Sequence, residues 1–184
     1  MKNEVFLIEP ECFNNFPVIS GITTRTGGVS KNGYSSFNMG FGSGDTKADV
    51  IKNREILYTR LKTEPKHFIY GKQVHGKEIV IINNTHLGMG AFDEKDAVQG
   101  IDGMITNKKN VFITIQTADC MSVFIFCPKN KVIGLLHAGW KGTHLNIISE
   151  CVSIMKENFN CSPEDLFVYL GPSISEKYYE VGKE

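Results

Sequence analysis

The sequence predicts an α+β fold built in layers. Short runs of β-forming residues follow one another along the chain, often with no helix between them, and only two segments show helical periodicity. A doubly wound sheet would instead alternate strands with helices. The chain has 184 residues, 41% of them hydrophobic, which is enough for a single domain, residues 1–184, with a substantial core.

The N-terminal part of the chain contains one predicted strand and one predicted helix. Residues 18–24 are rich in β-formers and run into a turn around Gly27-Gly28. Residues 33–44 hold too much glycine, serine and asparagine for a regular element. A helix is expected over residues 47–61, with Asp45 as its N-cap, because apolar residues recur there on one face.

The middle of the chain is predicted to be mostly β. Strands over residues 67–71 and 78–82 flank the turn Gln73-Val74-His75-Gly76, and residues 83–100 are loop-like. Further strands are expected over residues 101–106, 111–116, 121–126 and 132–136.

The last predicted elements are a helix and a buried strand. The helix should begin near Thr143, because Leu145, Ile148, Val152 and Met155 recur at helical spacing. The strand is expected over residues 166–170, an apolar run that ends before Gly171-Pro172.

Two histidines and one cysteine are the most informative residues. His75 lies in a turn, Cys120 at a break between strands and His137 at the end of a strand, which are positions where a rigid scaffold usually carries chemistry. Structural zinc sites normally close with four protein ligands, whereas catalytic ones keep an open position. The three scattered ligands therefore predict a metal-dependent enzyme, with zinc the best match to the donor set.

The same residues allow three other interpretations. Cys120 and His137 could form a metal-free cysteine hydrolase, with Cys120 as the nucleophile. One cysteine and two histidines also occur in type 1 copper sites, but the five histidines of the chain cannot build a trinuclear cluster as well. A binding module that holds zinc for stability is the non-enzymatic alternative.

Several other polar residues are candidates for binding or catalysis. Arg25 precedes a double-glycine turn, and Lys141 lies in a glycine-rich helix start, so both can hold an anion such as phosphate. Asn38 is a candidate in the glycine-rich stretch, where a turn role is the default. Asp102 and Asp119 are candidates to orient a metal-bound histidine or to act as general acid or base.

Composition excludes some classes of partner and points to the cytoplasm. The formal net charge is zero, so neither nucleic acid nor an anionic membrane is expected as the main partner. No apolar run reaches the length of about 20 residues that spans a bilayer, and the N-terminus does not resemble a signal peptide. The five cysteines are irregularly spaced, as expected for reduced thiols in the cytosol.

The motifs taken together resemble the YfiH/laccase-domain family over nearly the whole chain, and the His-Ala-Gly-Trp block is the most specific of them. The matching segments are Thr23-Thr24-Arg25, Gly27-Gly28-Val29-Ser30, Ser36 with Asn38, Gly44-Asp45, Asn53-Arg54, Gln73-Val74-His75-Gly76, Asp102-Gly103-Met104, Thr117-Ala118-Asp119-Cys120, His137-Ala138-Gly139-Trp140-Lys141-Gly142, Gly171-Pro172 with Ile174, and Tyr179-Glu180-Val181-Gly182.

The resemblance implies a function and a fold. Members are described as zinc-dependent purine nucleoside enzymes that phosphorolyse adenosine, inosine, guanosine and methylthioadenosine and deaminate adenosine; older labels call them copper polyphenol oxidases or laccases. The family's metal ligands carry over onto His75, Cys120 and His137, and its arginine onto Arg25. The implied fold is a layered α/β sandwich that is also grouped with cysteine hydrolases. Relatives usually continue beyond the Tyr-Glu-Val-Gly motif, so we expect this domain to lack a C-terminal segment that forms part of the pocket.

Overall fold

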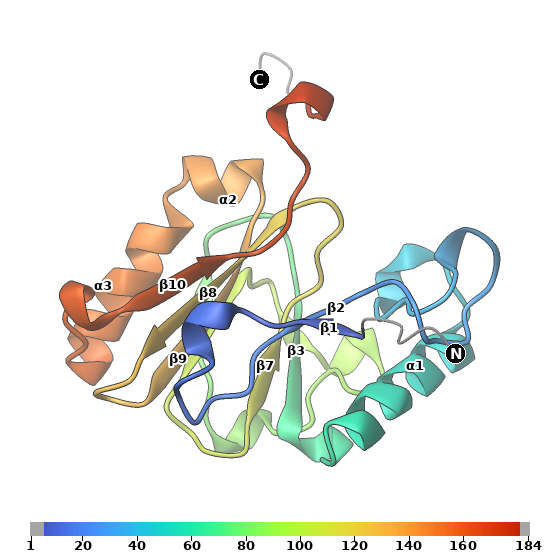
Figure 1. Cartoon of the computed structure of the whole chain (residues 1–184), viewed down its shortest axis with the longest axis horizontal. Coiled ribbons are helices and arrows are strands. Elements are labelled where there is room, and N and C mark those ends of the chain that lie inside the picture. The colour runs from blue at the N-terminus through green and yellow to red at the C-terminus, as the bar shows by residue number, and fades with distance from the viewer. Residues whose placement is uncertain (1–5, 181–184) are drawn as a thin grey trace.

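The computed structural model describes residues 6–180 and arranges them in four layers (Figure 1). Helix α3 covers one face of a five-stranded sheet, a three-stranded sheet packs against the other face, and helix α1 covers the outside of the smaller sheet. This is the layered α/β sandwich predicted from the sequence, and the predicted fold class is confirmed. The last residues of the Tyr-Glu-Val-Gly motif, 181–182, lie outside the described residues.

The larger sheet is mixed. Its strand order is β10-β8-β9-β6-β4, in which only β4 and β6 are parallel to each other. The bounds are β4 Ile79–Ile81, β6 Gly103–Thr106, β8 Met121–Cys127, β9 Val132–Ala138 and β10 Phe167–Leu170. A short turn connects β8 and β9, and the two antiparallel strands pair with each other over their full lengths.

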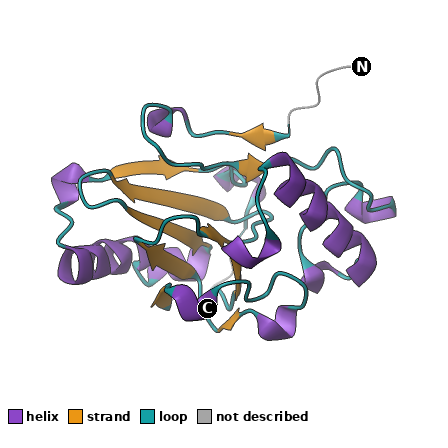
Figure 2. Cartoon of the chain, turned by 90° about the horizontal axis from the view of Figure 1, so that it is seen from below, coloured by secondary structure: helices purple, strands orange, loops and turns teal. Residues whose placement is uncertain are grey.

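The smaller sheet is entirely parallel, in the order β5-β3-β7. Its strands are β3 Phe68–Lys72, β5 Val98–Gln99 and β7 Phe112–Thr114. A separate antiparallel pair, β1 Leu7–Ile8 and β2 Ile22–Thr23, lies along the outside of the molecule (Figure 2). The predicted strand over residues 18–24 is therefore shorter than expected, since only its last part pairs with another strand.

Helix α1, Lys47–Arg60, lies close to the range predicted for it. Its N-cap is Thr46, whose hydroxyl accepts from the Asp49 N–H at 3.2 Å. The prediction of Asp45 as the cap is wrong: that carboxylate instead accepts from the hydroxyl of Ser30 at 2.6 Å. Helix α1 buries Leu57 and Tyr58 against the smaller sheet.

The predicted C-terminal helix is in fact two helices, α2 Trp140–His144 and α3 Ile147–Phe159. Asn146 separates them in a left-handed conformation with φ 60°, which ordinary residues avoid and asparagine tolerates. Helix α3 buries Ile147, Cys151 and Met155 against the larger sheet. The periodicity identified the helix, but it did not show the break.

Apolar side chains of both sheets meet between them. This shared core contains Ile69, Ile113, Met104 and Leu135, which come from β3, β7, β6 and β9. Short 3₁₀ turns connect the elements, at Glu11–Phe13, Asn32–Tyr34, Phe41–Ser43, Pro65–His67, Asn84–His86, Glu94–Asp96, Pro163–Asp165 and Glu176–Tyr178. None of the helices within residues 6–180 is long and apolar enough to cross a membrane.

The strand predicted over residues 166–170 exists as β10, but it is not buried. Phe167, Val168 and Leu170 keep 42%, 47% and 53% of their surfaces exposed. The strand lies at the edge of the larger sheet (Figure 1), a position that its apolar sequence could not reveal.

Candidate metal centre

The three predicted ligands converge at one end of the two sheets. His75 lies in the turn between β3 and β4, Cys120 directly precedes β8, and His137 is the penultimate residue of β9. Their potential ligand atoms all lie within 4.8 Å of one another. The two imidazole rings are 4.7 Å apart and nearly perpendicular, at 81°, so both face a common point.

The fold explains why residues so distant in sequence meet. Met121 pairs with Ala138 across β8 and β9, which places Cys120 beside the residues that follow His137. The turn that carries His75 crosses from the smaller sheet to the larger one, because β3 and β4 belong to different sheets. The site therefore lies where the two sheets are connected.

Asp102, which directly precedes β6, holds the site in place through hydrogen bonds. The carboxylate is fully buried and accepts the backbone N–H groups of Val74, His75 and Gly76 at 3.2, 3.0 and 2.7 Å. It also lies 2.7 Å from Nδ1 of His137. One buried side chain thus fixes both the turn that carries one imidazole and the orientation of the other.

The charge of Asp102 settles which nitrogen of His137 is free. Burial alone would raise the pKa of Asp102, but the hydrogen bonds from His137 and from the backbone of Gly76 and Val74 outweigh it and leave the pKa lowered. A carboxylate can only accept hydrogen bonds, so Nδ1 of His137 carries the proton and Nε2 keeps a lone pair for a ligand.

The turn around His75 has an unusual backbone. His75 has φ 58°, a left-handed conformation that costs free energy for a residue with a side chain. The three N–H bonds to Asp102 hold this conformation. The side-chain amide of Gln73 adds a second tie to the turn: it donates to the backbone carbonyl of Gln116 at 2.8 Å and accepts from the backbone N–H of Gln116 at 2.7 Å. Sequence reasoning named Gln73 only as part of the Gln73-Val74-His75-Gly76 motif and did not foresee its bonds to Gln116.

Gly139 leaves the space in front of the ligands open. A Cβ at this position would lie 3.2 Å from Sγ of Cys120, 3.4 Å from Cδ2 of His75 and 3.7 Å from Cε1 of His137. A side chain here would therefore fill the point that the three ligands face. The open cradle and the donor set of two imidazoles and a thiol fit a zinc ion with one position left for water or substrate.

Cys120 is not a pre-activated thiol in the protein alone. Burial raises its pKa, and the nearby carboxylates of Asp119 and Asp102 raise it further. A cation bound between the ligands would act in the opposite direction and stabilise the thiolate. The five cysteines of the chain are all free in the structure.

The other predicted site residues lie in different surroundings. Arg25 is exposed, and its guanidinium donates to the carbonyl of Ser35. Asn38 donates its amide to Gly40, Ser43 and Asp45 within the glycine-rich stretch. Asp119 is exposed beside Cys120, and Lys141 is exposed in α2 with Nζ 5.8 Å from the centre of the Trp140 ring. Asp119 therefore lies next to Cys120, while the side-chain hydrogen bonds of Arg25 and Asn38 are with residues of their own loop.

Comparison with known proteins gives consistent matches. A family model described as "Multi-copper polyphenol oxidoreductase laccase" matches residues 19–184. Purine nucleoside phosphorylase YlmD of Bacillus subtilis is 38% identical over 168 residues, covering 91% of this chain and 60% of that protein. The purine nucleoside phosphorylase of Bacteroides thetaiotaomicron is 33% identical over 163 residues, covering 89% of this chain and 60% of that protein.

Solved structures agree with these matches. YlmD from Geobacillus stearothermophilus is similar with a TM-score of 0.84 at 35% identity, covering 86% of this chain and 59% of that one. A hypothetical protein YfiH of Bacillus licheniformis is similar with a TM-score of 0.85 at 32% identity, covering 86% and 60%. The chain thus spans about 60% of the length of the curated relatives it matches.

Proposed function

The chain belongs to the YfiH/laccase-domain family, and on that premise we propose that it is a zinc-dependent purine nucleoside enzyme. Its reaction would be phosphorolysis of adenosine, inosine, guanosine and methylthioadenosine to the free base and ribose-1-phosphate or methylthioribose-1-phosphate, with deamination of adenosine as a second activity. The observation that carries the proposal is the convergence of His75, Cys120 and His137 around an open point. The names of the relatives support the choice of substrate.

A zinc ion at this point would supply Lewis-acid polarisation of a substrate atom or of a water molecule. The residues of the chain would do the rest. Asp102 orients His137 and keeps its Nε2 free. Asp119, the carboxylate next to Cys120, is proposed to move the proton, because the HxE with PCxxC pattern of common zinc deaminases is absent.

Phosphorolysis also needs a bound phosphate. The bond between the anomeric carbon and the purine breaks while a phosphate oxygen bonds to that carbon, and the purine leaves with the electron pair and takes up a proton. We assign phosphate binding to Arg25 and Lys141, two exposed cations whose charges favour an anion. Asn38 would act by shaping the loop next to Arg25, since its amide is engaged there.

A cysteine hydrolase is the second candidate, because Asp102 contacts His137 and His137 lies close to Cys120, as the three members of a catalytic triad do. Two observations favour the metal. A second imidazole, His75, faces the same point, and the pKa of Cys120 is raised, whereas a nucleophilic cysteine needs a lowered one.

A multicopper oxidase is disfavoured by the number and position of the histidines. The chain has five, and the two in the site leave three. The other three, His67, His86 and His144, belong to no group of three or more metal-ligating side chains among the described residues, so these histidines do not form a trinuclear cluster.

The test is metal content measured together with a phosphate-dependent assay on adenosine and inosine. We expect about one zinc per chain for the wild type, and ribose-1-phosphate formed by the wild type but not by Cys120→Ala. Cys12→Ala is the matched control, since Cys12 is exposed and outside the site. A protein without bound metal whose Cys120 is alkylated rapidly at neutral pH would overturn the proposal and support the hydrolase.

A further inference from the structure

Ser122, the second residue of β8, carries a buried hydroxyl that has no hydrogen-bond partner. The residue is 4% exposed, and among the buried side-chain nitrogen and oxygen atoms of residues 6–180 its Oγ is the one left without a partner. A buried hydroxyl that makes no hydrogen bond costs free energy, so such a group in a native fold needs an explanation. Its position in the sheet supplies one.

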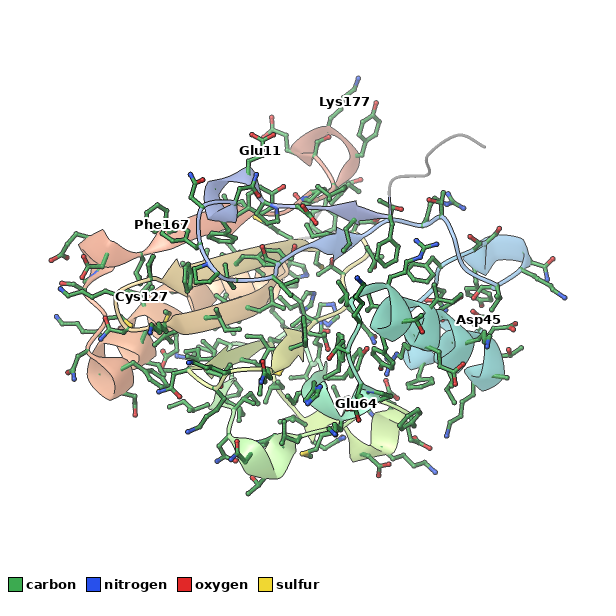
Figure 3. The ribbon with its side chains drawn as sticks, turned by 60° about the horizontal axis from the view of Figure 1, so that its bottom comes forward. Glu11, Asp45, Glu64, Cys127, Phe167 and Lys177 are labelled. Carbon is green, nitrogen blue, oxygen red and sulfur yellow. The ribbon has the colours of Figure 1, made fainter. Side chains whose placement is uncertain are left out.

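Ser122 lies at the end of β8 that borders the metal centre. Figure 3 labels Cys127 and Phe167 at the other end of the β8–β10 pair. Ser122 pairs with His137 across β8 and β9, so both side chains project from the same face of the sheet. Cys120 reaches this face as well, since its Sγ lies within 4.8 Å of a ligand nitrogen of His137. The hydroxyl, the imidazole and the sulfur are therefore neighbours.

The backbone hydrogen bonds show how closely Ser122 and His137 approach each other. The carbonyl of Ser122 accepts from the N–H of Gly171 at 2.8 Å, and the N–H of His137 donates to the carbonyl of Asp102 at 2.7 Å. The backbone groups of the two residues thus point away from each other, toward the sides of β10 and β6. Such residues form a non-hydrogen-bonded pair, the closer of the two kinds, with Cβ atoms about 4.5–5.5 Å apart.

In the structure the hydroxyl of Ser122 points toward Gly171. A Cβ at Gly171 would lie 2.2 Å from this Oγ and 2.9 Å from Cδ1 of Ile22, so the hydroxyl fills the space next to a residue that has no side chain. Rotation about one bond, Cα–Cβ of Ser122, brings Oγ into either of two other staggered positions. Both lie on the side of β9, and one of them also points toward the preceding residues, where Cys120 lies.

The sulfur of Cys120 is the acceptor that this position offers. The carboxylate of Asp102 already accepts from Nδ1 of His137 and from three backbone N–H groups. The lone pair on Nε2 of His137 is directed at the ion. A thiol is a weak hydrogen-bond acceptor, but a thiolate bound to a cation is negatively charged and accepts more strongly.

We propose that Ser122 is a positioning residue of the metal centre, whose hydroxyl donates a hydrogen bond to the thiolate of Cys120 when this sulfur binds an ion. The inference rests on the proposed function, because it requires Cys120 to be a metal ligand. The bond satisfies the buried hydroxyl and draws charge from the sulfur, which tunes how the sulfur holds the ion. Ser122 thereby does for the cysteine ligand what Asp102 does for His137.

The test is Ser122→Ala, with cobalt(II) bound in place of zinc. A thiolate bound to cobalt(II) gives a sulfur-to-metal charge-transfer band, and a hydrogen bond to the sulfur moves this band to shorter wavelength. We therefore expect the band of Ser122→Ala at longer wavelength than that of the wild type. Zinc affinity, measured by competition with a chelator, should fall about tenfold. The urea midpoint of the chelator-treated protein should not fall, because the variant loses a hydroxyl that has no partner.

Ser30→Ala is the matched control. Ser30 is also 4% exposed, but its hydroxyl donates to Asp45 at 2.6 Å and accepts from the side-chain amide of Asn53 at 2.8 Å. We expect the opposite pattern for this variant, with a lower urea midpoint and an unchanged cobalt band, because a bonded hydroxyl is lost at a distance from the ligands.

The outcomes separate this inference from the proposed function. An unshifted cobalt band in Ser122→Ala would overturn the inference, whatever the zinc affinity, and would leave the metal centre standing. A lower urea midpoint of the chelator-treated variant would also overturn it, since the hydroxyl would then be bonded within the fold. A wild-type protein without a thiolate-to-cobalt band would refute Cys120 as a ligand, and both the proposed function and the role of Ser122 would fall with it.

Discussion

Replacing Asp102 by asparagine tests the inference that one buried carboxylate holds the metal centre together. The side chain keeps its shape but exchanges one oxygen for an NH₂ group. If this group faces the N–H groups of Val74 and Gly76, two donors meet donors and both hydrogen bonds are lost. If it faces His137 instead, Nδ1 must become an acceptor, the proton moves to Nε2, and the ring can no longer bind a metal through that atom.

The size of the effect follows from these bonds. Hydrogen bonds to a charged group contribute about 1.5–3 kcal/mol each, so losing two should lower the free energy of unfolding by about 3–6 kcal/mol. Loss of the group that orients a ligand histidine typically lowers metal affinity by about 10- to 100-fold. Both changes come from a substitution that leaves the number of heavy atoms in the core unchanged.

Urea unfolding gives the first quantity, and competition with a chelator gives the second. The pKa of Asp102 is lowered in the folded state, so its contribution to stability is present above the unfolded pKa and is lost as the pH falls through the folded value. The difference between wild type and Asp102→Asn should therefore narrow below about pH 4.

Asp165→Asn is the control. Asp165 pairs with Lys129 at 3.2 Å on the surface, and loss of such a pair should cost no more than about 1 kcal/mol. If Asp102→Asn matched this control in both stability and metal affinity, the reasoning about the carboxylate would be refuted.

Three further outcomes are expected. Gly139→Ala should lower metal content with little loss of stability, because the added methyl lies 3.2 Å from Sγ of Cys120. Gly33→Ala, with open space around it, should leave metal content unchanged. Equal metal content in the two variants would contradict the inference that Gly139 keeps the metal position open. Arg54→Leu should lower the free energy of unfolding by at least about 3 kcal/mol, because the buried guanidinium donates to the carbonyls of Met39, Gly90 and Ala91. A urea midpoint equal to that of wild type would show that these bonds do not stabilise the fold. Alkylation of Cys120 in chelator-treated protein should be slow at pH 7 and should accelerate only at alkaline pH, because the pKa of this thiol is raised. Added zinc should suppress the reaction. Rapid labelling at pH 7 would refute the assignment of Cys120 as a metal ligand and not a nucleophile.

The sequence predicted most of the β structure, because buried strands carry the apolar runs that identify them. It failed where two different structures share one pattern. The apolar sequence of residues 166–170 is compatible with a buried strand and with an edge strand. Residues distant in sequence decide which of the two positions the strand takes. The helix break at Asn146 was equally invisible, because the apolar positions continue in phase on both sides of it.

For the site, the sequence singled out three candidate metal ligands by their type and their unusual motifs, and the structure brings them together. It offered two aspartates that could orient a histidine, but it did not reveal that Asp102 is the one that does so. The four hydrogen bonds of Asp102 depend on β6 lying between β9 and the turn at His75. The role of Gly139 required the positions of all three ligands, which only the folded chain supplies.

The crossing from β3 to β4 has a thermodynamic consequence. One prospective ligand, His75, belongs to the connection between the sheets, whereas His137 lies in the larger sheet and Cys120 directly precedes it. Coupling between two equilibria is reciprocal. If a bound ion stabilises the packing of the two sheets, then packing of the sheets strengthens ion binding by the same free energy. A cavity made in the shared core, for example by Met104→Ala, would then weaken metal binding from a distance, and ion affinity becomes a measure of how firmly the two halves of the sandwich are packed.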